Sequence, residues 1–503
     1  MPCQVADFFA GHLKTADGES VYFAARRVAN HAALATAAQL VTGTVLRPLN
    51  ASSSRNTVQL FIARHLARHI EEWVSRILVV RSLETAGGAH LLIRRPRRFP
   101  VGVLSEGAPE IHREYYDDPV REWSAFVGDV GMALLRNVWR FTHVRWPVSP
   151  HRSAKPMVRP ALLVMQEESL RNRNTLRNQL HFIDRDANQA PFETFVLMAP
   201  RAALFDNEQP CLLKGVTALP YESMGRALAE FRRHPCLRRV ARDRRRILIN
   251  LWRVESYSEF YCLIQVWLLL FQAQLLAGTF LKFGIRCFLT KEPRVGDAAQ
   301  LVAAEVGVTT VALQYSNTPF VSPGMMSTAD VFLVFSDAYR AVFESAGIGP
   351  GRFVVNGYLY DGVAPFVRSK AREHRRHLEQ HGARFVICYF DESVQHDRWG
   401  VISTHDHLSE LHALARLVVA SGDVGVIVKS QFMRNSPSAV YRSDALLAEA
   451  VRTGRYLEVR EGVHRNDVYP TEVALAADIC IGHKFGATAA LEAAAAGSRA
   501  ILI

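Results

Sequence analysis

The stretch "ADICIGHKFGATAALEAAAAGSRAILI" (Ala477–Ile503) carries the clearest fold signal in this chain. An apolar strand ends at Ile481, a glycine-containing turn follows, and alanine-rich helical sequence runs from near Ala487 to Gly497. Glycine suits a helix C-terminus, and a second apolar strand begins directly afterwards. A strand, a turn, a helix and a strand in this order predict one βαβ unit of a parallel sheet.

Apolar strands and helical patterns alternate throughout the C-terminal third of the chain, which is typical of a parallel sheet with helices on both faces. One helical pattern places Leu408, Leu411 and Leu414 at the spacing of a single helix face. The strands are predicted at Phe385–Tyr389, Val424–Val428, Tyr456–Val459, Ile479–Ile481 and Ala500–Ile503.

The N-terminal part is predicted as a helical segment followed by a second α/β unit. Apolar residues at helical spacing between Ile62 and Ile77 indicate an amphipathic helix. The strands of the second unit are predicted at His90–Ile93, Ala161–Met165, Glu193–Met198, Arg246–Leu251, Arg286–Thr290 and Thr309–Leu313.

These patterns predict three regions: a helical N-terminal segment over residues 1–85, an α/β domain over residues 86–350 and a second α/β domain over residues 351–503. The joint between the α/β domains is predicted near "GIGPGR" (Gly347–Arg352), whose glycines and proline interrupt the pattern. Because the sequence stops inside the apolar run "RAILI", we expect the last domain to be incomplete at its C-terminal end, as in a truncated chain.

The charge of the chain indicates an anionic partner. The 503 residues carry a formal net charge of +12, and much of the excess lies in Arg94–Arg98, Phe231–Arg246 and Arg372–His377. Such clusters attract nucleotide diphosphates or anionic lipid headgroups, and each alone can equally be a solvated helix face. We expect no nucleic acid as partner, since no recognised nucleic-acid motif accompanies the charge.

Cysteine usage and the start of the chain predict a cytoplasmic location. The 7 cysteines show no CxxC spacing, and the start "MPCQVADFFAGHLK" lacks a basic region followed by an apolar core. One segment, Cys262–Leu281, is long enough to cross a bilayer. It contains three glutamines and a glycine, so a buried helix is favoured over a membrane span. Contact with a membrane is therefore expected to be peripheral, through basic clusters.

Polar residues follow several of the predicted strands. Thr488 and Glu492 are four residues apart and share one face of the helix within the opening stretch. Free N–H groups at the start of that helix can hold a diphosphate, and a carboxylate one turn in can accept hydrogen bonds from ribose hydroxyls. The alternative is that Glu492 only complements the helix dipole.

Other strand ends contribute comparable groups. Lys429 directly follows "VGVIV", where an ammonium can pair with phosphate, and Asp391 and Ser393 follow another strand. Gly357 lies at a turn near the domain joint. Each alone can be a capping or turn residue, and together they form a predicted ring at one edge of the sheet.

Taken in order, the segments "TTVALQYSN", "ADVFLVFSD", "FVVNGYLYD", "FVICYFDES", "GVIVKS" and "ADICIGHKFGATAALEAAAAGSRAILI" resemble bacterial GT-B glycosyltransferase-like proteins of surface and capsular polysaccharide biosynthesis. The likeness covers about Leu281 to Ile503. It implies an α/β fold of two Rossmann-like parallel-sheet domains facing a cleft, with the nucleotide-sugar bound by the C-terminal domain and the acceptor by the N-terminal one. It also implies a nucleotide-sugar donor, a glycan or glycolipid acceptor, and no metal or other cofactor.

Glycosyl transfer needs a base for the acceptor hydroxyl and positive charge for the departing diphosphate. Glu292, which follows a strand, is the best base candidate, His483 can take either role, and Lys429 is the candidate cation. The predicted substrate-binding residues are Gln314, Tyr315, Ser316, Asn317, Gly357, Asp391, Ser393, Gly486, Thr488 and Glu492. The "HDH" run (His405–His407) lies where a helix is expected, which separates its imidazoles and argues against a metal site.

Two alternative functions stay open. A sugar-nucleotide 2-epimerase shares the double Rossmann-like layout and needs acid/base groups around the sugar ring. A non-catalytic homologue that only binds a nucleotide-sugar or polymer is suggested by departures from the family pattern. This chain has Gln314, Tyr315 and Ser316 where those proteins often show Gln-His-Gly, and Ser430 where a His or Pro often follows the lysine.

Overall fold

The computed structural model describes a large part of the chain, which forms two compact units. The main division falls between Asn356 and Gly357, and we call the described residues from Phe23 to Asn356 the N-terminal unit and those from Gly357 onward the C-terminal unit. The described residues are 21–43, 46–52, 54–67, 70, 161–166, 193–198, 216–219, 221–251, 257–291, 293–314, 316–317, 320–358, 363–391, 404–430, 441, 443–459, 468–483 and 488–503.

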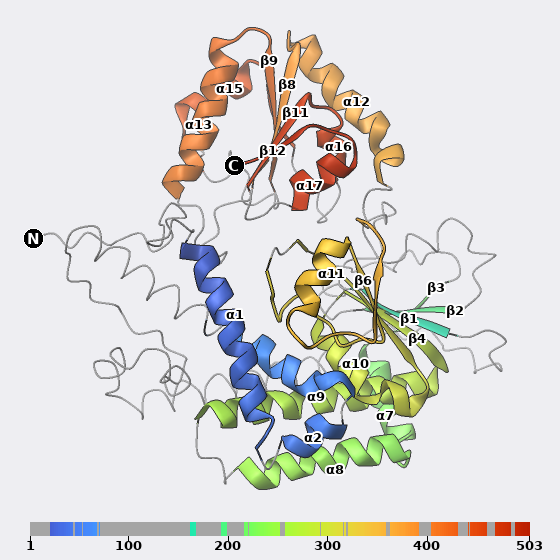
Figure 1. Cartoon of the computed structure of the whole chain (residues 1–503). Coiled ribbons are helices and arrows are strands. Elements are labelled where there is room, and N and C mark those ends of the chain that lie inside the picture. Colours follow the sequence, from blue (N-terminus) through green and yellow to red (C-terminus); the bar gives the residue numbers. More distant parts are fainter. Residues whose placement is uncertain are drawn as a thin grey trace, which may run out of the picture. The chain divides into compact units, whose positions relative to one another are not determined.

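The described strands of the N-terminal unit form a seven-stranded parallel sheet in the order β3-β2-β1-β4-β5-β6-β7 (Figure 1). The strands are β1 (Ala161–Gln166), β2 (Glu193–Met198), β3 (Val216–Leu219), β4 (Ile285–Thr290), β5 (Thr309–Leu313), β6 (Val331–Val334) and β7 (Arg352–Val355). The helices that accompany them are α7 (Tyr221–Glu230), α8 (Pro235–Asn250), α9 (Tyr257–Lys282), α10 (Pro293–Val306) and α11 (Asp337–Glu344). Four predicted strands, those of β1, β2, β4 and β5, are confirmed, and His90–Ile93 lies outside the described residues.

The strand predicted at Arg246–Leu251 is wrong, because most of it is the end of helix α8. The run "ILI" looks like a strand in a short window. Over the whole helix, Leu237, Val240 and Ile247 recur at helical spacing and are buried. Pro235 at the first helical position supplies the start signal that the shorter window leaves out.

Helix α9 is the core helix of the N-terminal unit. Most of its apolar side chains are buried in one cluster with α7, α8 and α10. Gly278 marks the crossing with α7, since an added Cβ would lie 2.8 Å from the backbone nitrogen of Leu228. Within the described residues, α9 contains the one segment apolar and long enough to span a membrane, Glu259–Lys282, and 61% of an 18-residue stretch of it is buried inside the protein. The packing supports the predicted buried helix.

The N-terminal helices pack into the same unit. Helix α1 (Val21–Leu40) buries Ala25, Ala29, Ala33 and Ala37, a stripe of small residues four apart that allows close contact. Helix α2 (Arg47–Ser52) and the short helix η1 (Ser54–Asn56) follow, and residues 57–67 are helical, as part of the predicted amphipathic helix requires. The rest of that predicted helix, apart from residue 70, lies outside the described residues.

The described strands of the C-terminal unit form a five-stranded parallel sheet in the order β10-β9-β8-β11-β12. The strands are β8 (Phe385–Asp391), β9 (Val424–Ser430), β10 (Tyr456–Val459), β11 (Ile479–Gly482) and β12 (Ala500–Leu502). The helices are α12 (Ala364–Gln380), α13 (Thr404–Ala420), α15 (Ala445–Arg452), α16 (Pro470–Ala474) and α17 (Thr488–Ala495). All five predicted strands are present, and Gly497 ends the last helical segment with φ +90°, as predicted for a C-terminal glycine.

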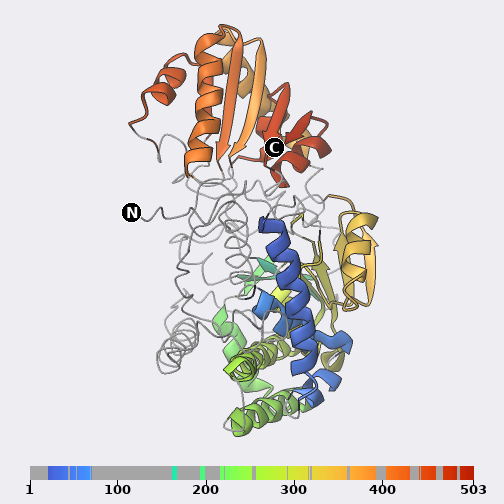
Figure 2. The same cartoon turned by 60° about the vertical axis from the view of Figure 1, so that its left-hand side comes forward.

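Successive side chains of the central strands point to opposite faces of the sheet, so the core of the C-terminal unit has two layers, one on each face. Ile387 and Tyr389 of β8 pack with α13 and α15 on one face. Cys388 packs on the other face with its register partner Cys480 of β11, and both thiols are free and fully buried. Figures 1 and 2 show helices on both sides of this sheet.

Both sheets share one topology. In each, the first strand is internal, the second and third are added on one side and the later strands on the other: β4 to β7 in the N-terminal unit, and β11 and β12 in the C-terminal unit. This is the strand order of Rossmann-type units. The predicted α/β, GT-B-like architecture of two Rossmann-like parallel-sheet domains is therefore confirmed.

Candidate functional site

The strand order of the C-terminal unit locates its ligand edge. The chain moves outward from β8 to β9 and β10 and then returns to place β11 on the other side of β8. In such sheets ligands bind outside the carboxyl ends of the strands, at the point where the order reverses. That point lies at the ends of β8 and β11, where Asp391 and Gly482 are the last strand residues.

Three titratable side chains meet at this point. The Tyr389 hydroxyl donates to Glu410 Oε2 at 2.5 Å, and His483 Nε2 lies 3.0 Å from that hydroxyl and 3.0 Å from Glu410 Oε2. Tyr389 and His483 are buried, whereas the Glu410 side chain keeps 30% of its surface exposed. Burial, reinforced by Glu410, raises the pKa of Tyr389 well above its usual value, so the phenol stays a donor.

A second group lies beside it on the same face of β8. Asp391 is buried, and its carboxylate is bonded by His407 Nε2 at 2.7 Å and by the Ser430 hydroxyl at 2.7 Å. His407 Nδ1 in turn lies 2.9 Å from the Tyr441 hydroxyl. Burial, with the charge of Asp391, raises the pKa of Tyr441 to about 12. Asp391 therefore fastens α13 and β9 to the end of β8.

We call these two groups the carboxyl-edge cluster. Its members are polar or titratable and lie at the carboxyl ends of parallel strands, on the helix α13 that follows β8, or, for Tyr441, in the connection between β9 and α15. They are Tyr389, Asp391, His407, Glu410, Ser430, Tyr441 and His483.

Lys429 is the penultimate residue of β9 and lies on the other face of the sheet. Because side chains alternate along a strand, Lys429 points to the same face of the sheet as Ile427, and Ser430 points to the opposite face. The Lys429 Nζ donates to the Ser430 backbone carbonyl at 3.0 Å. The side chain is buried, and its positive charge counteracts, to a small extent, the rise that burial causes in the pKa of Cys388. A buried cation is thus held at the ligand edge.

Helix α17 begins at Thr488, in the βαβ unit predicted from the opening stretch. The Thr488 carbonyl accepts from the Tyr358 hydroxyl at 3.5 Å. Glu492 is buried, and its Oε1 accepts from the Thr471 hydroxyl at 2.7 Å and from the Thr471 N–H at 3.2 Å. The carboxylate thus joins α17 to α16, and its predicted ribose contact stays a prediction.

The predicted residues of the N-terminal unit gather at the end of β5. Gln314 is buried, accepts from the Phe335 N–H at 2.9 Å and donates to the Ser316 carbonyl at 3.0 Å, so it ties the ends of β5 and β6 together. Asn317 accepts from the Tyr339 hydroxyl at 2.9 Å. Gly357, the first residue of the C-terminal unit, follows β7 and has φ +77°, a conformation that favours glycine.

Four predicted site residues cannot be placed. Glu292, Tyr315, Ser393 and Gly486 lie outside the described residues. The structure brings Lys429, Asp391 and His483 together at the carboxyl edge of one sheet, with Thr488 at the start of the helix that follows β11, while Gln314, Ser316 and Asn317 lie at the carboxyl edge of the other.

Sequence reasoning missed Tyr389, His407, Glu410, Ser430 and Tyr441 as site residues. Part of the signal was present, because Tyr389 and Asp391 are two apart on a predicted strand and so share a face. His407 and Glu410 are three apart on a predicted helix and also share a face. In the described part of the chain, no group of His, Cys, Asp and Glu side chains is arranged to hold a metal ion.

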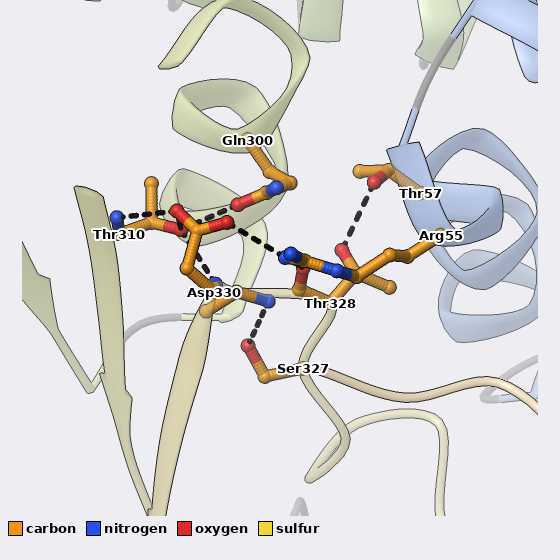
Figure 3. Close-up of polar contacts among 8 residues, drawn as sticks. Arg55, Thr57, Gln300, Thr310, Ser327, Thr328 and Asp330 are labelled. Atoms are coloured by element: carbon orange, nitrogen blue, oxygen red, sulfur yellow. Dashed lines mark hydrogen bonds and ion pairs between the residues drawn. The ribbon is translucent and has the colours of Figure 1, made fainter. Parts of the chain in front are cut away.

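A different polar network occupies the opposite edge of the N-terminal sheet, where β5 and β6 begin (Figure 3). Asp330 accepts from the Arg55 guanidinium at 2.8 Å and from the Thr310 N–H at 2.8 Å, and its Oδ2 lies 2.9 Å from the Thr310 hydroxyl. That hydroxyl also contacts Gln300. We call these four residues the amino-edge network. Arg55 has φ +62°, a strained value for a non-glycine residue.

No protein-family model and no curated protein matches this chain. Among solved structures, it is similar to a glycosyltransferase from Rickettsia africae, with 12% identity, 69% of this chain and 79% of that chain covered, and a TM-score of 0.40. It is also similar to HepE of Anabaena in complex with UDP, with 12% identity, 68% and 80% covered, and a TM-score of 0.36. UDP-GlcNAc 2-epimerase from Neisseria meningitidis bound to UDP-GlcNAc shows 10% identity, 68% and 82% covered, and a TM-score of 0.36. At such low scores we argue function from the residues of this chain alone.

Proposed function

We propose that this protein is a GT-B-type glycosyltransferase that moves a sugar, or a sugar-like group, from a nucleotide-activated donor to a surface-polysaccharide or glycolipid acceptor. The observation that carries the proposal is the carboxyl-edge cluster, which lies at the strand-order reversal of a Rossmann-type sheet. Buried titratable groups at such a position are typical of functional sites.

The edge offers groups of both kinds that glycosyl transfer needs. In the reaction the bond from the anomeric carbon to the diphosphate oxygen breaks, and a bond to the acceptor oxygen forms. The departing diphosphate gains negative charge, which Lys429 and the N–H groups at the start of α17 can stabilise.

The proton of the acceptor hydroxyl needs a base. The Glu410 carboxylate and His483 imidazole lie 3.0 Å apart and can share that proton, and Glu410 retains the exposed surface that such a transfer requires. Glu292, the best base candidate from the sequence, follows β4 in the sequence and stays an alternative to this pair. We propose a reaction without metal or other cofactor, in the cytoplasm, with the acceptor presented at the inner face of the plasma membrane.

Turnover of nucleotide sugars tests the proposal. UDP-glucose, UDP-N-acetylglucosamine, UDP-galactose and GDP-mannose are incubated with the protein and a lipid extract as acceptor source, and free nucleoside diphosphate is measured. We expect one donor to release its diphosphate only when acceptor is present. Calorimetry with UDP, GDP, CDP and ADP gives the second readout. Failure of every nucleotide to bind would contradict the assignment of the C-terminal unit itself.

A second candidate, sugar-nucleotide 2-epimerase, is favoured by one observation. The Tyr389–Glu410–His483 group combines a carboxylate, an imidazole and a phenol within one hydrogen-bonded unit, which is the type of acid/base equipment that proton removal and return at a sugar carbon require. Interconversion of a nucleotide sugar without acceptor would support the epimerase. Binding without either reaction would support a non-catalytic, nucleotide-sugar-binding protein.

A further inference from the structure

Helix α8 lies at the outside of the N-terminal unit (Figure 1), and its exposed face is basic. Its inner face packs on α9 through Cys236, Leu237, Val240 and Ile247, all of which are buried. The helix contains six arginines and a single acidic residue, Asp243. The position of each arginine relative to the inner face decides whether it contacts neighbouring helices or is exposed.

Two of the arginines are used inside the unit. Arg239 pairs with Asp243 at 3.2 Å and with Glu305 at 2.6 Å. Arg244 stacks over the ring of Trp267 at 4.3 Å and that of Phe271 at 4.5 Å, and donates to Gln274 at 2.7 Å. These contacts fasten α8 to its neighbours, and they already occupy the acidic residue of the helix.

The other four arginines, Arg238, Arg242, Arg245 and Arg246, are exposed. In the described part of the chain, no carboxylate lies at ion-pair distance from Arg242, Arg245 or Arg246. Like charges at i,i+4, as in Arg238 and Arg242, destabilise a helix by a few tenths of a kcal/mol each. Asp243 offsets part of this repulsion through its charge interaction with Arg242 and Arg246, and an external anionic surface would offset the rest.

Two exposed aliphatic side chains lie at the C-terminal end of α8, Ile249 on the arginine stripe and Leu248 at its margin. Leu248 is 47% and Ile249 is 51% exposed. Ile249 continues the stripe of Arg238, Arg242 and Arg245, because these positions recur at the spacing of one helix face. A cluster of arginines on a helix attracts anionic lipid headgroups, and aliphatic side chains that protrude beside it can enter the boundary between headgroups and acyl chains.

We propose that the outer face of α8 docks the protein on an anionic lipid bilayer. Arginines pair with lipid phosphates, and Leu248 and Ile249 insert among the acyl chains near the headgroups. The aliphatic residues decide against nucleic acid, whose phosphate backbone offers them no apolar partner. The inference does not depend on the proposed function, because binding is measured without substrate.

Vesicle sedimentation tests the proposal with the full chain. The probe is vesicles of phosphatidylcholine with roughly a third phosphatidylglycerol, against phosphatidylcholine alone. We expect binding to the anionic vesicles only, and substitution of Arg238, Arg242, Arg245 and Arg246 by Gln should weaken it about 100–1,000-fold, since each arginine near the surface contributes about 1 kcal/mol. Gln preserves helix propensity, and the pairs Arg238/Arg242 and Arg245/Arg246 serve as milder variants if the quadruple variant does not fold.

A matched control removes the same charge from the C-terminal unit. Arg368, Lys370, Arg372 and Arg376 are exposed on α12, and their replacement by Gln changes the net charge of the chain by the same amount. This control should retain vesicle binding within about threefold, well below the effect expected from removing charges that contact the bilayer. An equal loss in both quadruple variants would overturn the proposal, because net charge alone would then account for binding.

The aliphatic residues give the final distinction. The variant Leu248→Ser with Ile249→Ser keeps every arginine, and we expect vesicle binding to fall about 10–100-fold, since two buried aliphatic side chains contribute about 1.5–3 kcal/mol each when fully inserted and less when partly inserted. The same variants are titrated with a single-stranded oligonucleotide. Tight oligonucleotide binding that depends on the α8 arginines and not on the serine substitutions, with weak vesicle binding, would assign the face to nucleic acid and overturn the lipid proposal.

Discussion

The carboxyl-edge cluster and the amino-edge network use similar chemistry at opposite ends of parallel sheets. Each has a carboxylate that accepts several hydrogen bonds, Asp391 in one and Asp330 in the other. They differ in what surrounds the carboxylate. The carboxyl-edge cluster contains two histidines, two phenols and a second carboxylate, whereas the amino-edge network consists of groups that keep their protonation state near neutral pH. Position at the sheet and the presence of titratable partners, rather than polarity, distinguish a candidate site from a structural network.

The largest effect is expected at the carboxyl edge. Lys429→Ala should lower turnover by about 10²–10³-fold, the loss found when one electrostatic contact to a developing charge is removed, and should weaken nucleotide-sugar binding less. Steady-state kinetics and calorimetry on the same preparation measure the two effects. Lys370→Ala, an exposed lysine of the same unit, is the control. Equal losses in turnover and in binding would mean that Lys429 contacts the bound nucleotide-sugar and gives no additional stabilisation to the transition state.

Substitutions in the amino-edge network should lower the stability of the N-terminal unit and leave turnover unchanged. Asp330→Ala removes the acceptor of the Arg55 guanidinium and of the Thr310 N–H, and should lower the free energy of unfolding by about 2–4 kcal/mol. Urea unfolding of the N-terminal unit measures this, while the C-terminal unit provides an unchanged reference. A drop in kcat of folded Asp330→Ala protein comparable to that of Lys429→Ala would remove the distinction between the two regions.

Glu492 can affect both stability, as Asp330 does, and nucleotide-sugar binding, as a residue of the candidate site does. Its carboxylate accepts two hydrogen bonds from Thr471, so Glu492→Ala should lower the stability of the C-terminal unit by about 1–3 kcal/mol. If Glu492 also contacts the ribose, nucleotide-sugar affinity falls by a similar amount, measured by calorimetry well below the unfolding temperature. Thr471→Ala is the control, since it weakens the structural contact and leaves the carboxylate in place.

The smallest effect expected is the pH dependence of the Asp330 contribution. Burial alone would raise the pKa of Asp330, but hydrogen bonds from Thr310 and Arg55 outweigh it and hold the pKa below the ordinary value of 3.8. The stabilisation is therefore fully present above the unfolded pKa and is lost as the pH falls through the lower folded pKa.

The stability difference between wild type and Asp330→Asn should thus narrow as the pH falls from about 5 to about 3. Urea unfolding across this range measures it. A gap that widens on acidification would mean that the folded pKa is raised instead.

The fold could be predicted from sequence because the decisive signals are local. Runs such as Phe385–Tyr389 and Thr309–Leu313 are short, apolar and bounded by turns, and all of their information lies within a few residues. The error at Arg246–Leu251 has the same origin, since a short window cannot see the helix start at Pro235.

The candidate site could be predicted only in part. Asp391 and His483 were identified because strand ends are visible in the sequence. Their partners were not, because the pairing of Asp391 with His407 and of His483 with Glu410 depends on how α13 lies on the sheet. Glu492 illustrates the converse, since the predicted helix is correct and the sequence contains nothing that reveals its contact with Thr471.

The facing cysteines of β8 and β11 provide an intrinsic reporter of the ligand edge. Burial, together with the neighbouring Cys480 thiol, raises the pKa of Cys388 well above its usual value, so the reactive thiolate is suppressed at neutral pH. Both thiols point to the face of the sheet that α12, α16 and α17 cover, so an alkylating reagent reaches them only when this helix layer lifts from the strands. The labelling rate of these two cysteines under native conditions therefore reports local opening of that layer, and a nucleotide bound at the start of α17 should slow the labelling without any probe being attached.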